Sequence, residues 1–223
     1  MNRLIMDSLR HHIKVEKEKM KGFNSVAQLR EYLFLSGVAS INEYRLKKYG
    51  ITHVLNTATE LKDFQYPSGI TNILRVEMKD SASENLLKYI DECIDYIHMV
   101  RNNGGKVLVH CIAGMSRSVS VCLAYLVKYD SMTLKDAYDH VFNERRFIHP
   151  NQGFWKSLIS FEEEKTGKNT VEIRPYICGW EINVIEYETD LRIVNGWLED
   201  LFKFLFTPFL ILVMQIVWTG FYS

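Results

Sequence analysis

The sequence predicts an α/β fold, with a central, mostly parallel sheet flanked by helices. Three observations predict this class. Short apolar segments rich in β-branched residues alternate with longer segments whose apolar residues recur at helical spacing. Residues 106–110 (KVLVH) form a short apolar run of the kind that is buried in parallel sheets. The resulting strand–helix–strand order places parallel strands side by side, with the helices packed against them.

Four strands are expected from apolar or alternating segments bounded by turn residues. The first ends at Gly37 and the last leads directly into Cys111. In chain order they are residues 32–35, 51–55, 72–78 and 106–110. Two further strand-like segments, residues 171–177 and 181–187, follow the main alternation with a weaker pattern.

Helices are expected where capping signals mark their ends. Ser40 and Glu43 have the spacing of a capping box, and Gly50 follows that helix as a stop. Gly167 closes the last helix in the same way. The expected helices cover residues 40–48, 86–100, 118–128, 133–144 and 152–165. A weak apolar stripe in the charged first twenty residues predicts a surface helix or arm.

The composition excludes several classes of protein. With 223 residues, 47% hydrophobic and 24% charged, the chain is long enough for one good-sized core and is not disordered. The 27 basic and 27 acidic residues cancel, which argues against a nucleic-acid binder that relies on a basic surface. Four scattered cysteines form neither a disulfide framework nor a Cys-x-x-Cys pair. Without a secretory signal in the first residues, a reducing, cytoplasmic compartment is expected.

The segment after the fourth strand carries the chemistry. Cys111 is followed by Gly114, Arg117 and Ser118, and a helix is expected to begin there. A loop curled at a helix N-terminus points its backbone N–H groups at one spot, and Gly114 tolerates the curl. Arg117 can donate two N–H bonds to an oxyanion, and the same positive field favours the thiolate of Cys111. The pattern therefore predicts a phosphate site with a nucleophile beside it.

The spacing of Cys111 and Arg117 alone is a weak signal. A buried cysteine after a strand is ordinarily a small core residue. Here the strand before it, Gly114 within it and the helix behind it favour the phosphate site. The loop is not an ATP-binding loop, because Gly-x4-Gly-Lys-Ser/Thr is absent from the sequence.

The motif His-Cys-Ile-Ala-Gly-Met-Ser-Arg-Ser, residues 110–118, resembles the signature loop of the cysteine-dependent protein phosphatases, in the form typical of the dual-specificity group. Residues 32–40, 50–56 and 150–155 are similar to segments of its small, atypical members. The resemblance covers about residues 25–168 and agrees with the α/β fold expected above.

The resemblance implies a role for each catalytic residue. Cys111 would attack phosphorus and Arg117 would hold the phosphate. Asp80, 31 residues before Cys111, would protonate the leaving oxygen and then activate water. Glu77 and Glu84 compete for that role, but Glu77 is expected within a strand and Glu84 at a helix start. Asp80 would otherwise only cap a turn.

Further roles concern the phosphate loop and its supports. The loop residues that would surround the phosphate are Ile112, Ala113, Gly114, Met115 and Ser116. The resemblance also implies supporting residues, each of which would otherwise be purely structural. They are Ser118, which would donate to the sulfur, Asn151, which would hold the loop from behind, and His110, which would bond nearby backbone. No metal and no cofactor is required.

The substrate implied is a phosphoprotein, with phosphotyrosine and phosphoserine or phosphothreonine accepted. Ile112 and Met115 stand where the lipid-directed relatives resemble Cys-Lys-x-Gly-Lys, which disfavours a polyphosphorylated lipid. A phosphatase of another phosphoester, lipid or RNA, is the second hypothesis. A catalytically weak module that binds phosphoproteins is the third, and intact Cys111, Asp80 and Arg117 argue against it.

The end of the chain predicts contact with a membrane. Residues 204–222 contain 19 residues without a charged side chain, enough for a helix across a bilayer core of ~30 Å. The alternatives are a buried or interfacial helix and a segment that docks on the catalytic domain. We therefore expect an N-terminal arm (1–24), a catalytic domain (25–168), an extension (169–200) and a hydrophobic tail (201–223) that anchors a cytoplasmic enzyme.

Overall fold

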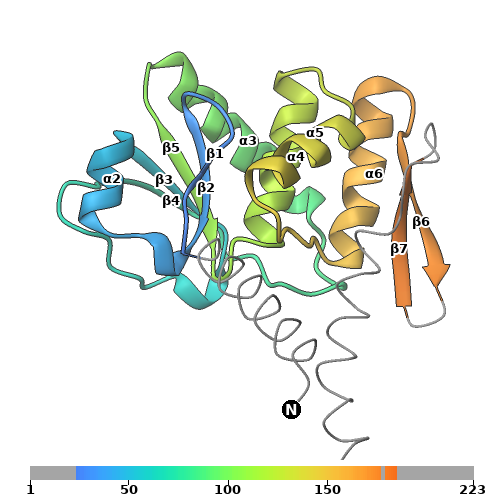
Figure 1. Ribbon diagram of the computed structural model, residues 1–223, viewed down its shortest axis with the longest axis horizontal. Coiled ribbons are helices and arrows are strands. Elements are labelled where there is room, and N and C mark those ends of the chain that lie inside the picture. The colour runs from blue at the N-terminus through green and yellow to red at the C-terminus, as the bar shows by residue number, and fades with distance from the viewer. Residues whose placement is uncertain (1–23, 177–178, 185–223) are drawn as a thin grey trace, which may run out of the picture.

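The computed structural model describes residues 24–176 and 179–184 of the chain (Figure 1). These residues form an α/β structure whose sheet is flanked by helices on both faces. The expected arm at the N-terminus and the expected membrane segment at residues 204–222 lie outside the described residues. No helix within the described ranges is long and apolar enough to cross a membrane.

The main sheet has five strands in the order β1-β2-β5-β3-β4. Strands β2, β5, β3 and β4 run parallel, and only β1 at the edge is antiparallel. The mostly parallel sheet is thus confirmed, although β4 ends three residues before Met78 and the two-residue β1 was not expected. The strands are β1 (Ala27–Gln28), β2 (Leu33–Gly37), β3 (His53–Asn56), β4 (Asn72–Arg75) and β5 (Val107–Cys111).

The five expected helices are present, and the first begins later than expected. Asn42, not Ser40, is the N-cap of α2, because its side chain accepts a hydrogen bond from the N–H of Arg45. Ser40 is instead buried in a short 3₁₀ turn and donates to the carbonyl of Ser25. The helical elements are η1 (Val38–Ser40), α2 (Glu43–Tyr49), η2 (Thr59–Leu61), α3 (Leu87–Asn102), α4 (Arg117–Tyr129), α5 (Leu134–Glu144) and α6 (Gln152–Thr166).

The strands are apolar on both faces, and alternate residues enter two different cores. Phe34, Val54 and Leu108 pack with Leu46 of α2 on one face. Their neighbours in the same strands belong to the larger core formed with α3–α6. These neighbours are Leu33, Leu35, Leu55, Val107 and Val109. The helices cover both faces, so the central strands are held rigidly.

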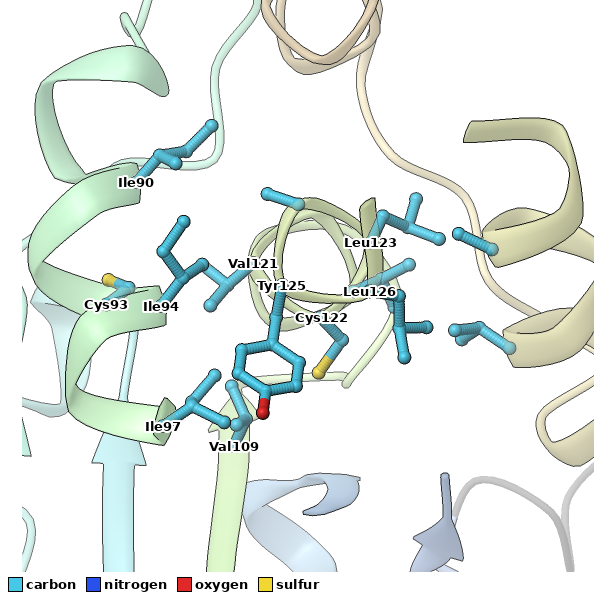
Figure 2. Close-up of a cluster of buried hydrophobic side chains, with 14 of the residues drawn as sticks. Ile90, Cys93, Ile94, Ile97, Val109, Val121, Cys122, Leu123, Tyr125 and Leu126 are labelled. Atoms are coloured by element: carbon cyan, nitrogen blue, oxygen red, sulfur yellow. The ribbon is translucent and has the colours of Figure 1, made fainter. Parts of the chain in front are cut away.

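Helix α4 lies at the centre of the larger core. Every residue from Arg117 to Val127 is buried. Figure 2 shows Ile94 and Ile97 of α3 on one side of α4 and Leu126 of α4 pointing to the other. Helices α5 and α6 pack against α4. The Cys111 loop therefore leads into the most completely buried helix of the described chain, which holds the end of the loop in place.

An antiparallel hairpin of β6 (Val171–Tyr176) and β7 (Gly179–Val184) follows α6 and lies beside it (Figure 1). Val171 is buried in the main core. The buried carboxylate of Glu162 in α6 accepts hydrogen bonds from the N–H groups of Leu134 and Thr170, at 2.7 and 2.9 Å. The start of the extension is thus joined to α5 and α6 by a carboxylate inside the core.

Candidate active site

The loop from Cys111 to Arg117 lies at the C-terminal end of the sheet, where β5 ends and α4 begins. Gly37, the last residue of β2, is the register partner of Cys111. A Cβ atom on Gly114, whose φ is +69°, would lie 2.5 Å from the carbonyl carbon of Ser36. A Cβ atom on Gly37 would lie 2.8 Å from the carbonyl oxygen of Ala113. Two glycines therefore allow the loop to curl tightly over the end of β2.

Arg145, which the sequence analysis did not select, holds the outside of this loop. Arg145 as a whole residue is only 2% exposed. It donates to the carbonyls of Gly114 (2.7 Å), Ala113 (2.9 Å) and Ser25 (3.1 Å). Burial lowers the pKa of Arg145 to about 10, while the neighbouring Cys111 opposes that shift. The buried cation therefore remains charged at neutral pH and favours negative charge on the thiol.

The carbonyls at both ends of the loop point outward as well. Ile112 accepts a hydrogen bond from the N–H of Val38 at 3.0 Å, and Met115 accepts one from the N–H of His149 at 2.8 Å. When successive carbonyls are bonded on the outside, their N–H groups are left for the interior. This is the arrangement of a backbone anion site at a helix N-terminus.

The thiol of Cys111 lies at the base of this anion site. Its side chain is buried and accepts hydrogen bonds from the N–H of Gly114 and the hydroxyl of Ser118, both at 3.2 Å. Each donor stabilises negative charge on sulfur. The structure thus places Ser118 where the sequence analysis expected it, next to the sulfur.

His110 lies behind the cysteine in a chain of hydrogen bonds. Its Nδ1 is 3.2 Å from the carbonyl of Cys111 and its Nε2 is 2.6 Å from the hydroxyl of Tyr66. Because a carbonyl only accepts, Nδ1 carries the proton and Tyr66 donates to Nε2. Burial lowers the pKa of His110 to about 4, so the ring is neutral at pH 7. His110 hydrogen-bonds nearby backbone as expected. Its second hydrogen bond, to Tyr66, was not expected from the sequence.

Arg117 is 3% exposed, and within the part of the chain that the structure describes only Nη1 of its guanidinium makes hydrogen bonds. Its Nη1 donates to the carboxylate of Glu60 and, at 3.1 Å, to the carbonyl of Met78. Its Nε has no hydrogen-bond partner in the described chain and lies 3.6 Å from Oδ2 of Asp80. Burial alone would raise the pKa of Glu60, but Arg117 lowers it below its ordinary value.

Asp80 is the carboxylate that the structure brings to the loop. Its Oδ1 accepts from the Ser116 hydroxyl at 2.7 Å and from the Asn151 side-chain amide at 2.9 Å. Of its two competitors, Glu84 accepts from the hydroxyl of Tyr89. The other, Glu77, is exposed and accepts from Thr59 instead.

Asn151 joins the Asp80 loop, the Cys111 loop and α6. Its side-chain oxygen caps α6 by accepting from the N–H of Phe154, and its own N–H donates to the hydroxyl of Ser116 at 3.2 Å. A Cβ atom on Gly153 would lie 2.1 Å from the carbonyl oxygen of Ala82. Glycine at this position therefore lets α6 approach closely enough for Asn151 to reach Asp80.

Sequence reasoning missed Glu60, Tyr66 and Arg145. A lone carboxylate or phenol in a loop carries no signal of its own. Arg145 stands in a charged stretch that is ordinarily solvated, so its burial could not be expected. Among the described residues, no group of three or more His, Cys, Asp or Glu side chains could hold a metal ion. The arrangement offers a nucleophile, an anion pocket and a carboxyl group.

Comparison with known proteins gives one consistent result. The family model described as "dual specificity phosphatase, catalytic domain" matches residues 33–164. Human dual specificity protein phosphatase 18 is 37% identical over 171 residues, covering 76% of this chain and 90% of the relative. Human dual specificity protein phosphatase 14 is 38% identical over 165 residues, covering 74% and 82%.

Solved structures agree with these relatives. The human tyrosine phosphatase-like serine/threonine/tyrosine-interacting protein is 30% identical, with a TM-score of 0.58, over 62% of this chain and 96% of that chain. Human DUSP28 gives 30% identity and a TM-score of 0.58, over 62% and 93%.

Proposed function

The chain belongs to the dual specificity phosphatase family of cysteine-dependent, metal-independent protein phosphatases, and from that premise we propose the role of each residue in its active site. Its substrates are phosphoproteins. In the proposal Cys111 is the nucleophile, Arg117 binds the phosphoryl oxygens and Asp80 is the general acid and base. The contacts of the Cys111 sulfur with Gly114 and Ser118 are the observation that carries it.

In the first step the thiolate of Cys111 attacks phosphorus in line with the leaving oxygen. The S–P bond forms, the P–O bond to the protein side chain breaks, and protonated Asp80 gives its proton to that oxygen. Arg117 and the loop N–H groups hold the three phosphoryl oxygens, so charge that builds up in the transition state meets donors already in place.

In the second step water attacks the cysteinyl phosphate and Asp80 takes a proton from the water. The S–P bond breaks and Cys111 leaves as a thiolate. The Ser118 hydroxyl, 3.2 Å from the sulfur, stabilises that leaving group. Inorganic phosphate departs and the enzyme returns to its starting state.

The hydrogen bonds of Asp80 select the oxygen that carries the proton. Oδ1 already accepts from Ser116 and Asn151, whereas Oδ2 lies toward Arg117. A proton is placed more easily on the oxygen with fewer donors aimed at it. In the proposal, Oδ2 therefore transfers the proton, and Ser116 and Asn151 hold the carboxyl group in position.

Hydrolysis of a small aryl phosphate tests these assignments. We expect turnover that resists EDTA, is abolished in Cys111→Ser, and falls roughly 10²–10⁴-fold in Asp80→Asn for substrates with a poor leaving group. Glu84→Gln is the matched control and keeps wild-type rates. Turnover that survives Cys111→Ser contradicts the nucleophile, and an Asp80→Asn variant as active as Glu84→Gln contradicts the acid.

For the organisation of the whole chain we propose a cytoplasmic catalytic domain of about residues 25–168, with an N-terminal arm before it, an extension of residues 169–200 behind it and a tail anchor at its end. Residues 204–222 lack charge and offer enough apolar side chains for weakly favourable insertion, and Lys203 marks the cytoplasmic boundary. A fluorescent fusion of the full chain is expected to pellet with membranes and resist carbonate extraction, while residues 1–200 stay in the supernatant. Equal partitioning of the two fusions contradicts the anchor.

A further inference from the structure

The two edges of the Arg117 guanidinium differ in their hydrogen bonding. Both protons of Nη1 have acceptors, the Glu60 carboxylate and the Met78 carbonyl. Among the described residues the Nε proton has no hydrogen-bond acceptor, although the side chain is only 4% exposed. Oδ2 of Asp80 lies 3.6 Å from Nε, beyond hydrogen-bond distance. A buried donor without a partner is destabilising, so such a group is kept where a ligand completes its hydrogen bonding. The unbonded edge is the one that a phosphate can take bidentately.

Glu60 is itself held by a rigid turn. The carbonyl of Leu61, the residue after it, accepts from the Asn56 side-chain amide at 2.8 Å and from Arg75 at 3.3 Å. The side-chain oxygen of Asn56 accepts from the N–H of Ala58 at 3.0 Å. Asn56 is buried at the end of β3, so the turn is fixed to the central sheet.

We propose that Glu60 is a positioning residue, which holds Nη1 of Arg117 so that its Nε edge faces the phosphate. The inference rests on the proposed role of Arg117. With Nη1 held by Glu60 and Met78, rotation of the guanidinium would break two hydrogen bonds. The phosphate-binding edge is thus oriented before substrate arrives, and little rotamer entropy is lost on binding.

The opposite effect is the alternative that the experiment must exclude. A carboxylate next to Arg117 also partly neutralises it and repels an approaching dianion. If that repulsion dominated, Glu60 would weaken phosphate binding and its removal would improve the enzyme. The side chain of Glu60 is 46% exposed, so water screens its charge while its hydrogen bond to buried Arg117 persists.

The test compares Glu60→Ala, Glu60→Gln and the control Glu77→Ala in the full chain. Glu77 is a nearby exposed carboxylate on the Thr59 side chain, without a hydrogen bond to Arg117. We expect Glu60→Ala to lower kcat/KM for an aryl phosphate and to weaken inhibition by tungstate, each by roughly tenfold or more. Glu60→Gln, which keeps an acceptor for Nη1, restores most of both, and Glu77→Ala changes neither.

Each result decides the matter. Tighter tungstate inhibition in Glu60→Ala overturns the positioning role, and so do values equal to those of Glu77→Ala. If Glu60→Ala melts at lower temperature than Glu77→Ala, Glu60→Gln at an unchanged melting temperature still tests the role, because it must bind tungstate better than Glu60→Ala. Calorimetric binding of tungstate, measured without turnover, keeps this outcome separate from failure of Cys111 as nucleophile.

Discussion

Replacing Arg145 by methionine tests how the phosphate loop is held in its curled form. Methionine keeps an unbranched apolar stem but removes the guanidinium that donates to the carbonyls of Gly114, Ala113 and Ser25. Two of these carbonyls belong to the loop. Without their donor they turn inward or are left unbonded, and both outcomes disturb the N–H groups that would hold the phosphate.

The magnitude follows from these three bonds. A buried acceptor that loses its donor costs about 1–3 kcal/mol. Part of this is offset, because burying the Arg145 charge itself costs several kcal/mol, as its lowered pKa of about 10 reflects. A net loss of about 3 kcal/mol in the free energy of unfolding lowers the melting temperature by roughly 6–12 °C for a chain of this size.

Thermal unfolding and tungstate inhibition measure the two effects separately. Arg145→Met is expected to melt about 6–12 °C lower and to show weaker tungstate inhibition, by roughly tenfold, at temperatures where it is folded. Arg146→Met is the matched control, since Arg146 is exposed and its guanidinium lies over the ring of Phe142. If both variants melt together and bind tungstate equally, Arg145 does not hold the loop.

Three further outcomes are expected. The pKa of His110 is about 4 in the folded protein and 6.5 when unfolded, so the unfolded chain binds more protons between these pH values. The free energy of unfolding, measured with urea, therefore falls by roughly 3 kcal/mol as the pH drops from 6.5 to 4. His110→Asn reduces this dependence on pH. Gly153→Ala forces a Cβ onto the carbonyl of Ala82 and displaces the acid loop, so kcat for alkyl phosphates falls more than for activated aryl phosphates; equal losses would contradict this. Asn42→Ala lowers the free energy of unfolding by about 1 kcal/mol, because it removes the side chain that caps α2, whereas Ser40→Thr leaves that cap in place. Chemical denaturation measures both variants.

Local patterns identified the strands and helices, because each buries residues at a period that the sequence displays. Residues 33–35 and 107–109 alternate between two cores, and α4 is buried from Arg117 to Val127. The predicted start of α2 was wrong. Ser40 and Glu43 have the spacing of a capping box, but it is the Asn42 side chain that accepts a hydrogen bond from the first turn of the helix. Spacing alone does not say which hydroxyl or amide faces the free N–H groups.

In the candidate site, too, some residues follow from a local sequence pattern and others come together only in the fold. Cys111 and Arg117 lie within seven residues, so one strand, one tight loop and one helix fix their geometry, and the local pattern was enough to predict them. The role of Ser118 followed from a resemblance. Asp80 followed from a resemblance and only the fold brought it to Ser116 and Asn151.

The tertiary structure alone decided which groups surround these residues. Glu60 reaches Arg117 across 57 positions of sequence, and Arg145 reaches Gly114 across 31. Neither has a local pattern, because a polar residue in a turn is ordinarily solvated. The partner that each of them meets depends on how distant segments pack. The sequence by itself therefore determined the fold class and the candidate phosphate loop, and packing decided which groups contact that loop and its arginine, since those contacts form only when the sheet, α4 and α6 have come together.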